Sequence, residues 1–119
     1  MCKSKIHRAK ITKADLHYEG SIGIDRLLMA KADIYSGEMV HVVNINNGSR
    51  FETYAIEEKG GSGAIGLYGA AAHMGKVGDL IIILSYGLFE DAGAKKVKLV
   101  AIKVDSNNRL LSRPQNLMK

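Results

Sequence analysis

The 119-residue sequence contains little of several residue types on which common protein classes depend. Its only cysteine, Cys2, cannot form an internal disulfide, which fits a reducing cytoplasm, and this chain-end thiol is expected to be mobile and inert. There is no tryptophan and there are two phenylalanines, so base-stacking aromatics are scarce. The one proline, Pro114, does not interrupt the body of the chain. The longest apolar run, residues 80–84, is far shorter than the roughly 20 residues that cross a bilayer.

Positive charge is concentrated at the start of the chain. Residues 1–20 contain five Lys or Arg and two acidic residues, a net charge of +3, while the whole chain carries +5. Such a field suits an anionic partner, either nucleic acid or a small acidic substrate. A basic strand that simply faces solvent explains the same cluster. No apolar signal core follows the first basic residues, so secretion is not expected.

The apolar pattern predicts a mainly β chain that forms one domain, residues 1–119. Strands are predicted at residues 5–12, 39–45, 51–56, 64–68, 80–86 and 96–104. Residues 17–24 are expected to be extended, with a break at Gly20 and Ser21. Many short strands with brief helices fit either a closed barrel or a sandwich, and the pattern alone does not choose between them.

Local signals predict the turns and helices between these strands. Asp25 can cap a short helix through about residue 31, in which residues 27–29 would be partly buried. The Asn-Asn-Gly turn signal at residues 46–48 predicts that residues 39–57 form a hairpin. We also expect a flexible loop at residues 60–63, a turn or short helical segment at 69–73, and a frayed tail after Asp105.

The common catalytic and metal-binding motifs are missing from the sequence. There is no GxxxxGK[ST] phosphate loop, no GxGxxG that joins a strand to a helix, no CxxC pair and no GxSxG elbow. The four histidines, His7, His17, His41 and His73, lack the spacing of metal ligands, and structural or surface roles are favoured for the last three. An enzyme of this sequence would therefore need a less common chemistry.

A series of short segments, by their joint order and spacing, resembles the pyruvoyl-dependent aspartate 1-decarboxylases. The similarity covers about residues 5–90. Each segment alone is weak, since a Gly-Ser pair is nearly always just a turn, but the series is specific. The segments are Lys5-Ile6-His7-Arg8, residues 14–21 ending in Gly20-Ser21, Asn46-Asn47-Gly48 with Arg50-Phe51, residues 53–56, residues 69–73, and Val77-Gly78-Asp79.

The resemblance implies a double-psi β-barrel with a few short helices, assembled as a homotetramer with active sites between subunits. It implies decarboxylation of L-aspartate to β-alanine and CO2 in the cytoplasm, on the pathway to pantothenate and coenzyme A. Some relatives need a helper protein for maturation, which makes such a helper a candidate partner. Neither nucleic acid nor a membrane is expected as a partner.

The same resemblance implies self-cleavage between Gly20 and Ser21 into a β chain of residues 1–20 and an α chain of residues 21–119. A serine hydroxyl can attack the preceding carbonyl through a five-membered ring, and glycine leaves that carbonyl open. Elimination and hydrolysis then turn Ser21 into a covalent pyruvoyl group. Its ketone forms a Schiff base with aspartate and accepts the electrons left when CO2 departs, as pyridoxal phosphate does in other enzymes. Neither pyridoxal phosphate nor a metal is therefore expected.

The resemblance assigns three basic residues to the substrate. Arg50 would hold a carboxylate with its planar guanidinium, and Lys5 and His7 would add positive or hydrogen-bonding contacts. Without the resemblance, Arg50 would be interpreted as an exposed strand residue. Lys5 and His7 share one face of a strand, which is common by chance.

Further residues would serve proton transfer, cleavage and the pocket wall. Tyr54 would donate a proton to the carbanion, and Thr53 would polarise the Gly20 carbonyl during cleavage. Tyr54 could instead be an aromatic residue of the core or of an interface. Thr53 could simply be an exposed strand residue. The pocket wall would be formed by the small residues Gly69, Ala70 and Ala71, for which tight packing is the alternative.

Two positions depart from the family pattern. Tyr68 stands where the family usually has an asparagine near the cleavage site, and a tyrosine is bulkier and lacks the paired donor and acceptor of an amide. Val43 stands where many relatives carry an aromatic residue. Tyr68 motivates one alternative, a family member impaired in cleavage or catalysis. The basic segment 1–20 motivates another, a basic β-barrel that binds nucleic acid.

Overall fold

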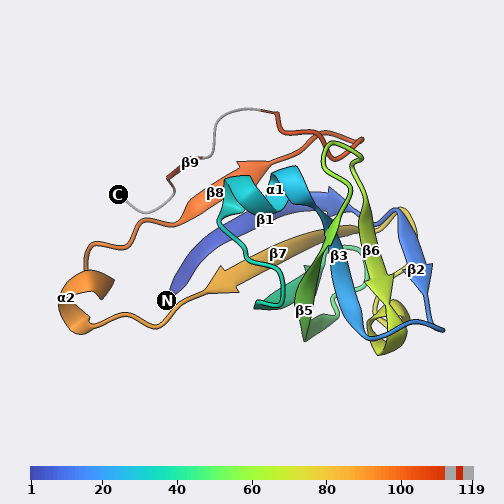
Figure 1. The fold of residues 1–119 in the computed structure, drawn as a ribbon, viewed down its shortest axis with the longest axis horizontal. Helices are drawn as coiled ribbons and strands as arrows, with labels where there is room; N and C mark the ends of the chain where they lie inside the picture. Colours follow the sequence, from blue (N-terminus) through green and yellow to red (C-terminus); the bar gives the residue numbers. More distant parts are fainter. Residues whose placement is uncertain (112–114, 117–119) are drawn as a thin grey trace.

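The structure is a computed structural model that describes residues 1–111 and the backbone of residues 115–116 (Figure 1). It is mainly β, as predicted. Within the described residues the strands form one mixed sheet in the order β2-β6-β3-β5-β4-β7-β1-β8-β9. The strands are β1 (Cys2–Lys10), β2 (Lys13–Asp15), β3 (Ser21–Asp25), β4 (Met39–Asn44), β5 (Arg50–Glu58), β6 (Ile65–Tyr68), β7 (Leu80–Tyr86), β8 (Val100–Lys103) and β9 (Gln115–Asn116). The helices are α1 (Arg26–Ala32), the 3-10 helix η1 (Gly69–His73) and α2 (Asp91–Ala94).

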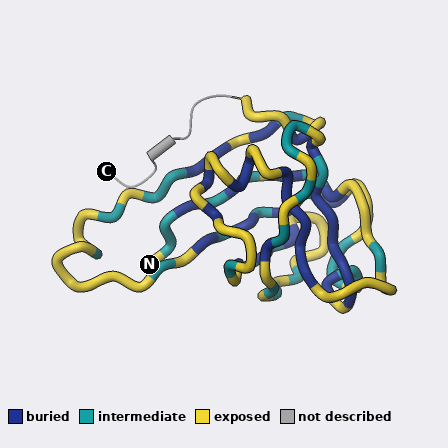
Figure 2. Tube along the Cα trace, viewed as in Figure 1, coloured by how far each residue is buried: buried dark blue, intermediate teal, exposed yellow. Residues whose placement is uncertain are grey.

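Figure 1 shows β3, β5 and β6 running across the direction of the long strands β1 and β7. The buried stretches gather in these strands (Figure 2). On β3 and β6 the core side chains are Ile22, Ile24, Ile65 and Leu67, each 0% exposed. Each such burial stabilises the fold by roughly 1.5–3 kcal/mol. Because a slip of one residue would turn these side chains out of the core, the core fixes the register, and with it the place of Ser21.

The predicted hairpin is confirmed. β4 and β5 pair antiparallel, from Met39 opposite Tyr54 to Val43 opposite Arg50. The turn begins at Asn44, whose side-chain oxygen accepts hydrogen bonds from the backbone amides of Asn46 and Asn47 at 2.8 and 3.2 Å. Arg50 therefore starts β5 directly after the turn.

The predicted cap of α1 is also confirmed, because the Asp25 carboxylate accepts a hydrogen bond from the Leu27 amide at 2.9 Å. The same carboxylate accepts from the amides of Gly61 and Gly63, each at 2.9 Å, so the expected flexible loop is tied to the helix start. Leu27 is 55% exposed and was wrongly expected to be partly buried. None of the helices in residues 1–111 has the length and apolar character needed to cross a membrane.

The C-terminal part differs from the prediction. The strand predicted at residues 96–104 is confined to β8, and the short helix α2 precedes it. Residues 105–111 are not frayed, since the side chain of Asn108 bonds the backbone of Lys10 and of Gly63 at 2.7–2.8 Å. Long-range bonds of this kind leave no local sequence pattern. The rest of the expected frayed tail, at residues 112–114 and 117–119, lies outside the described residues.

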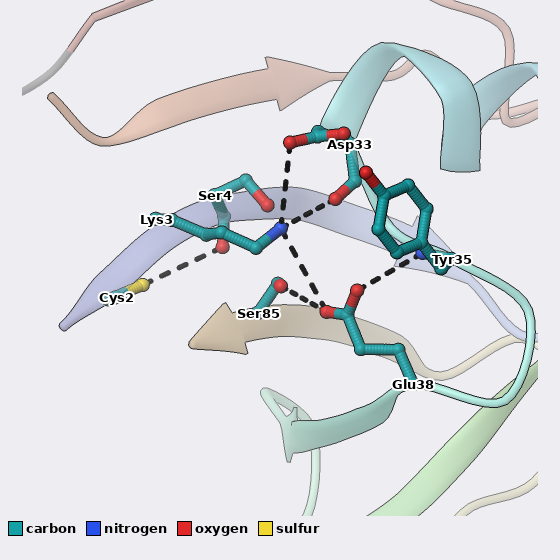
Figure 3. Close-up of polar contacts among 7 residues, drawn as sticks. All are labelled: Cys2, Lys3, Ser4, Asp33, Tyr35, Glu38 and Ser85. Atoms are coloured by element: carbon teal, nitrogen blue, oxygen red, sulfur yellow. Dashed lines mark hydrogen bonds and ion pairs between the residues drawn. The ribbon is translucent and has the colours of Figure 1, made fainter. Parts of the chain in front are cut away.

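Near the N-terminus, polar contacts join the neighbouring strands β1 and β7 to the segment between α1 and β4 (Figure 3). Lys3 Nζ donates to the Asp33 carbonyl oxygen at 2.5 Å and lies 3.9 Å from the Glu38 carboxylate, which also accepts from the Ser85 hydroxyl. Cys2 lies in β1 and is therefore not a mobile chain end, contrary to expectation. Burial raises the pKa of the Cys2 thiol, which favours its unreactive protonated form.

Candidate active site

Ser21 is the first residue of β3 and lies opposite Tyr68 of the antiparallel strand β6. Its side chain is buried, and its hydroxyl donates to the Glu19 carbonyl oxygen at 3.2 Å. This bond holds the hydroxyl within the backbone turn that contains Gly20. The predicted nucleophile and the carbonyl that it would attack thus belong to one fixed turn.

Gly69 packs directly against the segment that precedes Ser21. Its φ is +66°, and a Cβ added to it would lie 2.7 Å from the Cα and N atoms of Gly20 and from the Tyr18 carbonyl oxygen. A residue with a side chain would be strained by the backbone angle and would also collide with this segment. Of the other predicted wall residues, Ala70 is exposed and Ala71 belongs to the hydrophobic core.

Tyr54 and Thr53 lie on β5, which runs parallel to β3. The pairing begins with Ile22 opposite Ala55, so Tyr54 is level with Ser21 and Thr53 is level with the residue before it. Side chains level with each other on paired strands point to the same face of the sheet. Tyr54 is 40% exposed and is therefore accessible from solvent on the face that carries Ser21.

Arg50 is the first residue of β5, and Tyr54 is the fifth. Arg50 lines a surface hollow of about 380 Å³, together with His41 and Glu52, whose Nε2 and carboxylate oxygen are 3.2 Å apart. Three residues lie between Arg50 and Tyr54, so their Cα atoms are about 13 Å apart along the strand. Positions 50 and 54 are an even number of steps apart, so the side chains of Arg50 and Tyr54 point to the same face of the sheet.

Lys5 and His7 lie on β1, which β7 and β4 separate from β5. Three strand spacings place them about 14 Å from β5 along the sheet. His7 lines a different hollow of about 440 Å³, together with Arg8 and Lys103. Burial, followed by the positive charges of Lys5, Arg8 and Lys103, lowers the pKa of His7. Its Nδ1 is buried and has no hydrogen-bond partner in the described part of the chain.

The structure thus divides the predicted site residues into separate groups. The residues that it brings together are Gly20, Ser21, Thr53, Tyr54 and Gly69, and those that lie elsewhere on the chain are Arg50, Lys5 and His7. Among the described residues no three His, Cys, Asp or Glu side chains are grouped so that they could hold a metal ion.

Comparison with known proteins shows to which family the chain belongs. The sequence matches the profile of the family described as aspartate decarboxylase over residues 1–111. The chain belongs to the aspartate decarboxylase family. A relative from Thermoanaerobacter pseudethanolicus, named aspartate 1-decarboxylase, is 57% identical over 109 residues, which cover 92% of this chain and 93% of the relative. An aspartate 1-decarboxylase from Maricaulis maris is 50% identical over 115 residues, covering 97% and 95%.

Among solved structures, one similar protein has a much lower sequence identity to this chain. The crystal structure of a rationally designed protein, mkDPBB_sym_86, has a TM-score of 0.49 and 18% sequence identity, and the match covers 69% of this chain and 95% of that chain. The double-psi β-barrel is the arrangement that the resemblance to the aspartate decarboxylase family implies.

Tyr68 is the residue that the sequence resemblance places at an expected asparagine position. Its ring does not point at the Gly20–Ser21 bond but runs back over Gly66, where an added Cβ would lie 2.5 Å from the Tyr68 hydroxyl. That hydroxyl donates a hydrogen bond to the Glu58 carboxylate. Burial and then this bond raise the pKa of Tyr68, so its phenol is protonated at neutral pH.

Two residues near the site, Glu58 and Tyr18, were not predicted from the sequence. The Tyr18 ring lies 4.9 Å from the Tyr68 ring, centroid to centroid. The one available signal was the pair Gly23 and Gly66, which alternate with apolar residues and leave a strip of β3 and β6 without side chains. Such a strip makes room for neighbouring side chains, but the sequence does not show which ones.

Proposed function

We propose that this protein decarboxylates L-aspartate to β-alanine and CO2 for pantothenate and coenzyme A biosynthesis in the cytoplasm, after cutting its own chain between Gly20 and Ser21. The single observation that supports this most directly is the packing of Gly69 on Gly20 beside a buried Ser21 hydroxyl. Membership of the aspartate decarboxylase family supports the decarboxylation itself. The packing of Gly69 on Gly20 supports self-cleavage at the Gly20–Ser21 bond.

Cleavage would begin with attack of the Ser21 hydroxyl on the Gly20 carbonyl carbon, and the peptide bond is exchanged for an ester as the nitrogen leaves. The turn that holds Ser21 Oγ near the Glu19 carbonyl keeps the hydroxyl close to this carbon. Thr53, level with Gly20 on β5, would polarise the carbonyl oxygen by hydrogen bonding. Loss of the Ser21 α-proton then expels the Gly20 carboxylate, and hydrolysis yields a pyruvoyl group and ammonia.

The surroundings of Ser21 fit a pyruvoyl group. Gly69 packs on the backbone of Gly20 and adds no side chain beside Ser21. Such a group supplies an electron sink for the bond that breaks as CO2 leaves. Tyr54, level with Ser21 and partly exposed, is the residue placed to return a proton to the α-carbon of the substrate.

The basic residues would hold the two carboxylates of aspartate. Arg50 offers a planar pair of donors, and Lys5 and His7 offer further contacts. The Cα atom of Arg50 lies about 13 Å along β5 from that of Tyr54, and we propose that a neighbouring subunit supplies Arg50 to the site. A homotetramer with sites between subunits is the assembly we propose, with a helper protein as a candidate partner in maturation.

Intact mass spectrometry tests the cleavage. Two fragments that meet between residues 20 and 21 are expected, the larger with a pyruvoyl group in place of its amino terminus. Ser21→Ala should remain one chain, whereas Ser62→Ala, at another Gly-Ser pair in the loop before β6, should cleave normally. Borohydride with radiolabelled L-aspartate should label the larger fragment. One intact polypeptide after long incubation, without CO2 release, would refute the proposal.

Co-expression tests the shared site. Tetramers that mix Ser21→Ala and Arg50→Ala chains contain some sites with Ser21 from one chain and Arg50 from another. These mixtures should recover part of the activity that each variant lacks alone. No recovery in mixed tetramers would show that each chain supplies its own complete site.

A further inference from the structure

A strip without side chains runs along the outer face of β3 and β6, next to Ser21. Gly23 and Gly66 pair across the two strands. The Tyr68 ring lies over Gly66 and the Glu58 carboxylate lies over Gly23, since a Cβ added to either glycine would collide with them. The Tyr68 hydroxyl donates to that carboxylate, and the ring is only 6% exposed. The slot therefore fixes the ring in one orientation.

Tyr18, two residues before Gly20, covers the Tyr68 ring from the solvent side. The ring centroids are 4.9 Å apart and the planes are tilted by 43°, an arrangement in the range that aromatic pairs favour. Lys13 Nζ lies 5.8 Å from the centroid of the same ring, within the range of a cation–π contact. Tyr18 is itself 59% exposed, so the contact with Tyr68 lies at the protein surface.

The same segment is held from a second side. The Gly69 backbone approaches Gly20 and the Tyr18 carbonyl oxygen so closely that no Cβ fits between them. The backbone of residues 18–20 thus rests on Gly69, and the side chain of Tyr18 rests on Tyr68. Both contacts act on the three residues that precede the bond to be cut.

We propose that Tyr68 is a positioning residue for self-cleavage: it acts through Tyr18 to hold residues 18–20, and so the Gly20 carbonyl, against the Ser21 hydroxyl. This rests on the proposed self-cleavage. After the cut Gly20 becomes a chain end, and chain ends fray unless they are tied down. The Tyr18–Tyr68 contact would then keep the end of the 1–20 fragment beside the new pyruvoyl group.

Time courses of cleavage, followed by intact mass from freshly synthesised chain, test the proposal. Tyr18→Ala and Tyr68→Leu each remove one ring and should slow cleavage about three- to tenfold, in line with the free energy of an aromatic pair. Tyr18→Phe and Tyr68→Phe keep both rings and should cleave at close to the parent rate. Tyr35→Ala, an exposed tyrosine on another part of the chain, is the control. Cleavage of Tyr18→Ala at the parent rate would overturn the proposal.

A second measurement does not depend on cleavage. In the Ser21→Ala background, amide hydrogen exchange in a peptide covering residues 16–20 reports how firmly this segment is held. Tyr68→Leu should speed this exchange about three- to tenfold and Tyr68→Phe should not; an unchanged rate in Tyr68→Leu would overturn the proposal. Faster exchange in Tyr68→Leu, together with a parent chain that stays uncut, would refute the self-cleavage and support the holding role.

Discussion

Ser21 and Tyr68 face each other across the β3–β6 ladder, and the Tyr68 ring turns away from the bond before Ser21 to lie over Gly66. The phenol is therefore anchored by Glu58 and leaves the space beside the predicted cleavage bond free. A bulky residue at this position thus does not by itself obstruct the approach of Ser21 Oγ to Gly20.

The first prediction concerns Tyr68→Asn, which restores the usual family residue. If Tyr68 impaired this protein, the change would speed cleavage or turnover. Because the ring lies off the bond and supports Tyr18, we expect Tyr68→Asn to cleave no faster than the parent in a mass-spectrometric time course. Faster cleavage would favour the impaired-member alternative.

Gly69→Ala should damage both stability and cleavage. The positive φ costs a residue with a side chain roughly 1–2 kcal/mol, and the contact with Gly20 adds to this. We expect the free energy of unfolding, measured in urea, to fall by about 2 kcal/mol or more, and cleavage to slow at least about tenfold. Gly78→Ala is the matched control, because its φ is +97° and nothing lies near an added Cβ. Equal cleavage in the two variants would show that the Gly69 contact is not needed.

Tyr54→Phe should separate cleavage from decarboxylation. The variant keeps the ring that lies level with Ser21 and removes only the hydroxyl that we propose as proton donor. Loss of a general acid lowers a rate by about 10²–10⁴, so CO2 release from fully cleaved protein should fall by that factor. Tyr35→Phe, at an exposed tyrosine, should release CO2 at the parent rate. An unchanged rate in Tyr54→Phe would assign the proton transfer to another group.

Arg50→Lys should weaken substrate binding more than it slows the chemical step. Lysine keeps the charge but loses the paired donors that match a carboxylate. A hydrogen bond to a charged group contributes about 1.5–3 kcal/mol, so KM for aspartate should rise about ten- to hundredfold. Cleavage, measured by mass, should be unaffected because no role in cleavage is proposed for Arg50. Arg109→Lys, at an exposed arginine in the turn after β8, is the control.

His7 should make the fold less stable in mild acid. Its pKa is lowered in the folded state, so below the usual value of about 6.5 the unfolded chain binds more protons. The free energy of unfolding should therefore fall as the pH drops from about 6.5 towards the folded pKa. Urea unfolding of His7→Gln should show a shallower fall between about pH 7 and pH 5 than the parent. His73→Gln, at an exposed histidine, should keep the parent slope, and an equal slope in His7→Gln would contradict the assignment.

Local structure and family membership could be predicted from the sequence. The β4–β5 hairpin, the Asp25 cap and the apolar strand β7 follow from turn chemistry, capping and short apolar runs, which act over a few neighbouring residues. The order of the short segments from Lys5 to Asp79 sufficed to indicate the family, which the comparisons confirmed. The hairpin, the cap and the strand depend on residues close together in the chain. The family assignment depends on the order of the short segments along the chain.

Only the tertiary structure decided which distant residues meet. Ser21 lies opposite Tyr68 because the buried side chains of β3 and β6 fix the register, and Asn108 holds the C-terminal segment through bonds to Lys10 and Gly63. The periodicity of one strand does not name its partner, since pairing is decided when the shared core closes.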